Sequence, residues 1–244
     1  YERDVAAPTR DGRRLYVDIY RPKDQVDVPV IVAYTPFGKR HWYGQSIAPG
    51  LHQAMGVPKG TISVLAAFEA PDPSYWCRNG YAVANVDAAG VGYSEGDFQG
   101  MNSQYGRDGA DIVEWLAKQK WCNGNVGMAG NSGLAIAQWF VAAECPPSLK
   151  CIAPWEGTAD FYRESMFPGG IPYAAFAGMI HLSLRGNGLI QDPVEDMKVH
   201  PLFDTYWNDY KAKVENTRIP VYATAGYTHP LHLRGTIQSY LKIR

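Results

Sequence analysis

The stretch that decides the fold is VGMAGNSGLA, residues 126–135. It begins with an apolar run, continues through a tight Gly-Asn-Ser-Gly segment, and leads into further apolar residues. This order predicts a buried strand, a sharp turn and a buried helix, the arrangement called a nucleophile elbow. Glycines beside the serine leave room for a strained corner. We therefore predict that Ser132 stands exposed at the corner as a nucleophile, with the N–H of Gly133 close enough to stabilise an oxyanion.

Apolar runs separated by helical patterns extend on both sides of this corner. They predict strands at residues 14–20, 28–34, 81–86, 126–129, 151–154 and 219–225, and helices at 109–120 and 134–144. Buried strands that alternate with helices of this length predict a mostly parallel sheet with helices on both faces. Asp108 and Asp111 are expected near a helix start, where the helix dipole favours anions.

Residues 161–210 break this alternation, because they are rich in glycine, proline and aromatic residues. We interpret them as a short helical cap insertion over the strand ends. A long surface loop is the alternative, and one of this length would be unusual in a compact domain. The expected organisation is a core at 1–160, a cap at 161–210 and a return to the core at 211–244.

The composition narrows the classes of function. Lys and Arg number 23 against 24 Asp and Glu, so no attraction to nucleic acid or an anionic membrane is expected, and a small-molecule substrate is favoured. The polar first residues and the lack of a run of ~20 apolar residues favour a cytoplasmic protein. The four cysteines lack metal-site or disulfide spacing, so neither a metal nor a cofactor is expected. The apolar content is compatible with a homo-oligomer.

Several blocks, in order, resemble one family of serine hydrolases. They are DGRRLYVDIYRP (11–22), YTPFGK (34–39), NGYAVANVDAAGVGYSEG (79–96), the block 108–132, APWEGTADFYRE (153–164), HPLFDTYW (200–207), IPVYATAGY (219–227) and LHLRG (231–235). The chain resembles the CocE/NonD family (cocaine esterase and X-Pro dipeptidyl-peptidase, peptidase S15 type). This resemblance implies an α/β-hydrolase fold. It also implies a serine that attacks an ester or amide carbonyl, a His that moves the proton and an Asp that orients the His.

The resemblance places Ser132 as nucleophile and Gly133 as an oxyanion donor, while other places differ. Phe37 stands where the family has an oxyanion-binding tyrosine, and losing such a donor typically costs ~10²–10³ in rate. Ala89 replaces a family arginine, which is expected to change loop support rather than chemistry. Thr228 and His229 stand where the family acid is expected.

The family histidine would follow a later strand, and the sequence ends at Arg244. The resemblance therefore predicts that the triad is incomplete in this chain and that the C-terminal part of the family fold is missing. A serine without a base is a weak nucleophile at neutral pH.

Other polar residues are candidates because they follow predicted strands, where ligands gather in α/β sheets. His229 is the candidate base, and His232, in a segment similar to the family's own, is expected to line the pocket. Glu156 and Asp160 are expected to line the pocket or anchor the cap, Asp160 through Arg163. Trp155 is a candidate pocket residue, although core packing explains it equally well.

Three functions stay open at this point. The first is hydrolysis of a small ester or amide through an acyl-enzyme on Ser132. The second is a non-hydrolytic step, such as elimination, decarboxylation or cyclisation, on a small apolar metabolite. The third is a non-catalytic binding protein.

Overall fold

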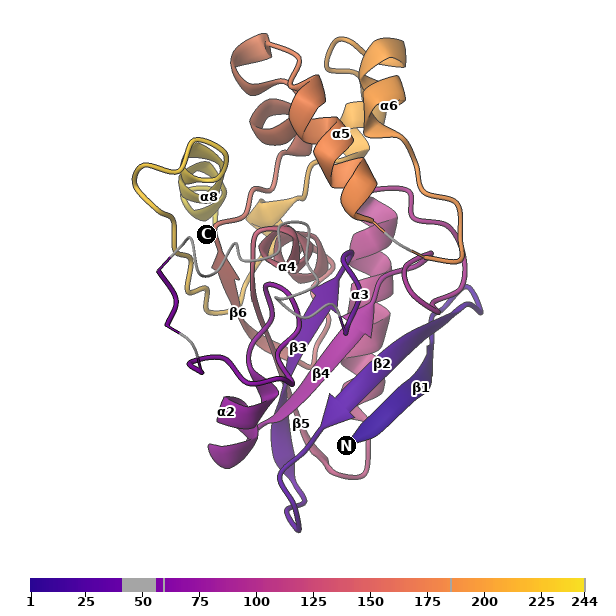
Figure 1. The fold of residues 1–244 in the computed structure, drawn as a ribbon, viewed down its shortest axis with the longest axis vertical. Helices are drawn as coiled ribbons and strands as arrows, with labels where there is room; N and C mark the ends of the chain where they lie inside the picture. Colours follow the sequence, from indigo (N-terminus) through magenta and orange to yellow (C-terminus); the bar gives the residue numbers. More distant parts are fainter. Residues whose placement is uncertain (41–55, 59, 185, 244) are drawn as a thin grey trace.

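The computed structural model describes residues 1–40, 56–58, 60–184 and 186–243. Its centre is a six-stranded sheet with the order β1-β2-β4-β3-β5-β6 (Figure 1). Neighbouring pairs among β4, β3, β5 and β6 are parallel, whereas β1 and β2 pair antiparallel at one side. The strands are β1 Glu2–Pro8, β2 Arg14–Tyr20, β3 Val28–Thr35, β4 Ala82–Asp87, β5 Cys122–Asn131 and β6 Leu149–Trp155. The mostly parallel sheet predicted from the sequence is therefore confirmed.

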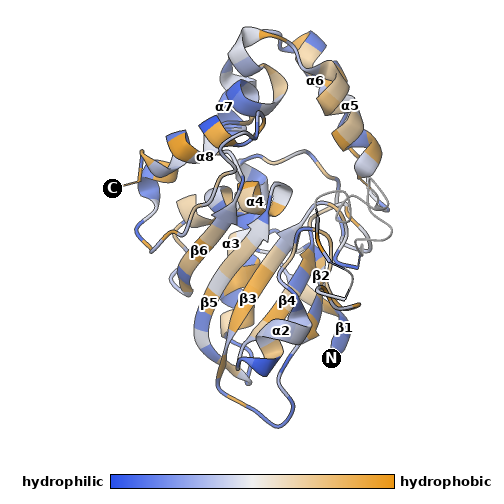
Figure 2. Cartoon of the chain, turned by 60° about the vertical axis from the view of Figure 1, so that its left-hand side comes forward, coloured by the Kyte–Doolittle hydropathy of each residue, from blue (hydrophilic) through white to orange (hydrophobic). Residues whose placement is uncertain are grey.

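Helices cover both faces of this sheet. The helices are α2 Pro73–Arg78, α3 Ser103–Ala117, α4 Gly133–Ala143, α5 Ala174–Ser183, α6 Pro193–Val199, α7 Thr205–Asp209 and α8 Leu233–Tyr240. Helices α3 and α4 pack against each other on one face, and α2 lies on the other (Figure 2). The two central strands β3 and β4 are buried almost throughout and carry the hydrophobic residues that Figure 2 shows in the middle of the sheet.

Helix α4 is buried along nearly its whole length, as its apolar sequence predicts. Trp139 and Ala137 are 0% exposed and Phe140 is 3% exposed. A helix that is apolar all round must be covered on all sides, and the sheet, α3 and the turn at 214–216 cover this one. The start of α4, directly after Ser132, is therefore held rigidly.

Helix α3 begins earlier than the sequence pattern indicates. Its N-cap is Asn102, whose side chain accepts a hydrogen bond from the N–H of Tyr105. The expectation that Asp108 and Asp111 lie at the helix start is therefore wrong, because both lie within the helix. Asp108 pairs with Arg13 at 2.8 Å and Asp111 pairs with Arg10 at 2.7 Å. These ion pairs tie α3 to the β1–β2 turn.

Two differences concern strands. The edge strand β1 was not predicted, because its residues ERDVAAP show little apolar periodicity. Residues 219–225, predicted as a strand, lie beside β6 but make only isolated bridges, Val221 with Ile152 and Thr224 with Trp155. Pro220 and Pro154 lack the N–H that a continuous ladder needs, which explains why no regular strand forms.

Residues 161–210 form a π-helix at Tyr162–Met166 followed by α5, α6 and α7. They share a second hydrophobic cluster, separate from the main core, made of Met166, Phe167, Ala177, Met197, Trp207 and Tyr210. Figure 1 shows α5 and α6 beyond the end of the sheet toward which β3 and β4 run. The three-part division at 160 and 210 stays a prediction. In the described part of the chain, no helix has the length and apolarity to cross a membrane.

Candidate active site

Ser132 lies at the corner between β5 and α4 with φ 50° and ψ −110°. A positive φ is unfavourable for a non-glycine residue, so the surrounding structure must impose it. The Ser132 N–H donates to the carbonyl of Trp155 at 2.9 Å, and its carbonyl accepts the N–H of Ile136 at 2.9 Å. A Cβ on Gly130 would lie 2.6 Å from the Cβ of Leu134, so the corner requires a small residue there. The corner has the geometry expected of a nucleophile elbow.

Phe37 covers the start of α4. A Cβ on Gly133 would lie 2.7 Å from Cε2 of Phe37 and 3.3 Å from Cε of Met101. Phe37 is 5% exposed, and its ring meets Phe68 edge to face at 5.4 Å. The ring of Phe37 fills the space that a side chain at Gly133 would need. That ring offers no hydrogen-bond donor.

Glu69 is a site residue that the sequence reasoning missed. The Gly133 N–H donates to Oε2 of Glu69 at 3.2 Å, and the Asn131 N–H donates to the Glu69 carbonyl at 3.0 Å. Glu69 belongs to neither a helix nor a strand, so no periodicity marks it. Only the tertiary structure brings it to the nucleophile.

The surroundings of Glu69 favour its neutral form. Burial raises the pKa of Glu69 to about 8, while hydrogen bonds from Gly133, Ser132 and Asn131 lower it in part. The negative charge of Glu156 raises the pKa further. Both effects act on the charged form, because burial removes water from a carboxylate and a second carboxylate repels it.

Glu156 follows β6 and holds the next loop. Its backbone is also strained, with φ 55°. Its N–H donates to the carbonyl of Thr224 at 2.8 Å, and its Oε1 accepts the N–H of Gly226 at 2.7 Å. Glu156 therefore connects the elbow side of the sheet with the loop that carries His229. Its predicted contact with substrate stays a prediction.

His229 and His232 stack with ring centroids 4.8 Å apart. His229 Nδ1 accepts the N–H of Leu231 at 3.3 Å, so a neutral ring in this position carries its proton on Nε2. His232 is 4% exposed, its Nδ1 is buried without a hydrogen-bond partner, and burial lowers its pKa to about 4. Within the described residues, no hydrogen bond joins either histidine to Ser132. The structure brings the two histidines to each other rather than to the nucleophile.

Asp160 and Trp155 are two further residues that the sequence predicted at the site. Asp160 accepts the backbone N–H of Arg163 at 3.0 Å and pairs with its guanidinium at 2.9 Å, the partner expected for a cap anchor. Trp155 is partly buried, and the contact it makes with the nucleophile runs through its backbone carbonyl.

A small apolar cavity of about 40 Å³ lies between the core and residues 161–210. Its lining includes Met101, which also contacts the Gly133 position, together with Phe161, Leu184 and Trp207. Met101 thus contacts both this cavity and the start of α4.

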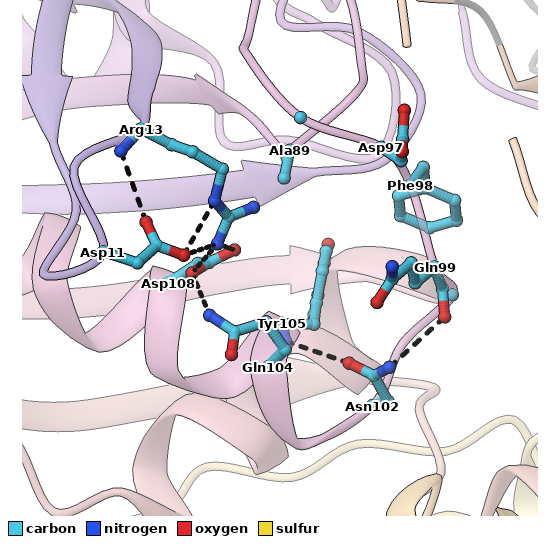
Figure 3. Close-up of a pocket in the computed structure, with 12 residues that line it drawn as sticks. Asp11, Arg13, Ala89, Asp97, Phe98, Gln99, Asn102, Gln104, Tyr105 and Asp108 are labelled. Atoms are coloured by element: carbon cyan, nitrogen blue, oxygen red, sulfur yellow. Dashed lines mark hydrogen bonds and ion pairs between the residues drawn. The ribbon is translucent and has the colours of Figure 1, made fainter. Parts of the chain in front are cut away.

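A second, polar cavity of about 310 Å³ lies at Ala89 and is lined by Asp11, Arg13 and Asp108 (Figure 3). Arg13 bridges the two carboxylates there. Asp11, Arg13 and Asp108 form an ion-pair network that joins the β1–β2 turn to α3, which gives this part of the cavity a structural setting.

Comparison with known proteins places this geometry in context. Residues 11–188 match the family model described as X-Pro dipeptidyl-peptidase (S15 family). The chain is similar to cocaine esterase from Rhodococcus sp. (strain MB1 Bresler), with 33% identity over 187 residues, covering 77% of this chain and 29% of that protein.

Solved structures agree. A CocE/NonD family hydrolase from Staphylococcus aureus matches with a TM-score of 0.88 and 34% identity, covering 99% of this chain and 44% of that chain. An aminopeptidase from the marine sediment archaeon Thaumarchaeota archaeon matches with a TM-score of 0.78, 16% identity, and coverage of 99% and 45%. That second likeness shows the fold alone.

The present chain spans less than half the length of each of these proteins. Over that length it reproduces the α/β-hydrolase fold expected from the sequence, with a strained serine at the strand-to-helix corner. The chain belongs to the X-Pro dipeptidyl-peptidase (S15) family, within which its resemblance to the CocE/NonD hydrolases is confirmed.

Proposed function

We propose that this protein is a serine hydrolase that cleaves an ester or amide of a small molecule through an acyl-enzyme on Ser132. The observation that carries the proposal is the strained backbone of Ser132 at the β5–α4 corner, next to the N–H of Gly133. Strain of this kind costs ~1–3 kcal/mol and persists where the surrounding structure imposes it, often at functional sites. The names of the relatives, cocaine esterase and CocE/NonD family hydrolase, support the same chemistry.

The geometry suggests how the residues act. Oγ of Ser132 attacks the carbonyl carbon and loses its proton to a base, while the carbonyl electrons move onto the oxygen. The N–H of Gly133 and the positive end of α4 stabilise that oxygen. Collapse of the intermediate releases the alcohol or amine, and water then hydrolyses the acyl-enzyme.

The two other functions rest on weaker grounds. The residues that differ from the family, Phe37 and His229, favour a non-hydrolytic step. The named relatives, however, are hydrolases. The role of His229 as base, the small-molecule partner, the cytoplasmic location and a homo-oligomer stay predictions.

A fluorophosphonate probe tests the proposal, because it reacts with activated serines. The full-length protein should be labelled and should hydrolyse 4-nitrophenyl esters, and Ser132→Ala should abolish both. Ser74→Ala on α2, a serine bonded to Arg78, is the matched control and should keep both. Labelling that persists in Ser132→Ala, or a wild-type protein that neither labels nor turns over, would contradict the proposal.

A further inference from the structure

Glu69 is held at the nucleophile by the same kind of strain as Ser132. Glu69, Ser132 and Glu156 have φ values of 62°, 50° and 55°. Ser132 directly follows β5, Glu156 directly follows β6, and the Glu69 carbonyl accepts the N–H of Asn131 at the end of β5. The Glu69 backbone is fixed by the hydrogen bond from Asn131, and its carbonyl oxygen lies 3.2 Å from a Cβ position on Gly130. The fold thus holds this carboxyl against the corner with its backbone in an unfavourable region.

In the described part of the chain, the backbone N–H that the structure places at this corner is that of Gly133. Oxyanion sites generally use more than one donor, and loss of one costs ~10²–10³ in rate. The side chain packed over Gly133 is Phe37, which cannot donate. The polar side chain in contact with the Gly133 N–H is that of Glu69, at 3.2 Å.

A carboxyl group can serve as a donor only when it is protonated. The negative charge of Glu156 opposes the ionisation of Glu69. The corner itself contributes Asn131, Ser132 and Gly133, which are uncharged, and Phe37 contributes an apolar ring. A neutral carboxylic acid that donates to an oxyanion is a known catalytic device in apolar sites.

We propose that Glu69, as a neutral carboxylic acid, is the second donor of the oxyanion hole. Its hydroxyl replaces the tyrosine hydroxyl of the family, which Phe37 lacks. This inference rests on the proposed function of Ser132. The substrate carbonyl oxygen replaces Oε2 of Glu69 at the Gly133 N–H. When Oγ of Ser132 bonds to the carbonyl carbon, the Glu69 hydroxyl donates a hydrogen bond to the resulting oxyanion and keeps its proton. The proton of Ser132 goes to the base of the hydrolase reaction.

The position of Glu69 distinguishes this role from that of a general base. A general base needs to reach only the serine hydroxyl, whereas the carboxyl of Glu69 accepts the backbone N–H of Gly133, which defines the oxyanion position. The two roles predict opposite pH dependence. A donor is active when protonated, so kcat/KM falls as pH rises through the pKa of Glu69, near 8; a base is active when ionised, so kcat/KM rises.

The test measures kcat and KM for 4-nitrophenyl butyrate from pH 6 to 10 on the full-length protein. Glu69→Ala should lower kcat by ~10²–10³ with little change in KM. Glu69→Gln, which keeps a donor but cannot ionise, should recover most of that loss and should lack the alkaline fall of the wild type. Phe37→Tyr in the Glu69→Ala background should recover part of kcat, because it puts a phenol beside Gly133. Glu215→Ala, an exposed carboxylate far along the chain, is the control.

Four outcomes would overturn the inference about Glu69. Labelling of Ser132 by the probe would still support the hydrolase function in each of these cases. They are an unchanged kcat in Glu69→Ala, a kcat above wild type in that variant, a Glu69→Gln variant as slow as Glu69→Ala, and a wild-type kcat/KM that rises through pH 8. If Glu69→Ala does not fold, the wild-type pH profile and Glu69→Gln still decide the question. A wild type without labelling or turnover defeats the hydrolase proposal itself, and the role of Glu69 with it.

Discussion

The β5–α4 corner and the loop at residues 226–232 both contribute residues predicted to be catalytic, and they are built in different ways. The corner is a continuous stretch whose strain is held by β6 and α4, with Ser132 bonded to Trp155 and Ile136. The loop is held from outside, by the Glu156 carboxylate on the N–H of Gly226. Its histidines stack on each other instead of reaching the serine. A nucleophile encoded by adjacent residues is thus placed by local sequence, whereas its partners depend on distant contacts.

The largest expected effect on stability and labelling comes from a larger side chain at Gly130, in the β5–α4 corner. Gly130→Ala should lower the free energy of unfolding by ~3 kcal/mol and abolish labelling of Ser132, because the new Cβ would lie 2.6 Å from the Cβ of Leu134. Urea unfolding monitored by tryptophan fluorescence measures the change. Gly124→Ala is the matched control, since that glycine also has a positive φ but meets nothing within 4 Å. Equal losses in the two variants would show that the corner is not sterically tight.

The stability of the protein should fall in acid because His232 is buried in the loop at residues 226–232. The pKa of His232 is lowered from 6.5 to about 4 in the folded state, so the fold favours the neutral ring. The stability that this contributes is complete above pH 6.5 and is lost as pH falls toward 4, by at most ~3 kcal/mol. Melting temperatures from pH 7.5 to 4.5 should therefore fall more steeply in the wild type than in His232→Leu. Parallel curves would show that His232 is not buried as a neutral ring.

The contribution of Glu69 to stability should depend on pH in the opposite direction to that of His232. The pKa of Glu69 is raised from 4.5 to about 8, so its contribution to stability is complete below pH 4.5 and is lost as pH rises toward 8. The melting temperature of Glu69→Gln relative to wild type should therefore rise between pH 5 and pH 9. A constant difference across that range would mean that Glu69 ionises normally in the fold.

The smallest effect should be a gain in stability at the corner. Ser132→Gly removes the strain of a side chain at φ 50° and should raise the free energy of unfolding by ~1 kcal/mol while abolishing labelling. Ser132→Ala keeps the Cβ and should give no such gain, which separates strain from loss of the hydroxyl. A destabilised Ser132→Gly would show that the backbone there is relaxed.

The sequence could predict the sheet and the corner because both follow from patterns of residues that are close together in the chain. The apolar runs at 28–34 and 126–129 correspond to β3 and β5, and the apolar residues after Ser132 correspond to α4. The edge strand β1 has no such pattern. Likewise, Asp108 appeared to mark a helix start, although its partner Arg13 lies far away in the chain.

By itself, the sequence determined the family, the parallel sheet and the place of Ser132, since each follows from residues adjacent in the chain or from motifs in order. Only the tertiary structure decided which groups meet the serine. Glu69 reaches it from a loop more than sixty residues earlier, and His229 turns instead to His232. Such contacts depend on how separate segments pack, and no local periodicity encodes the distance between them.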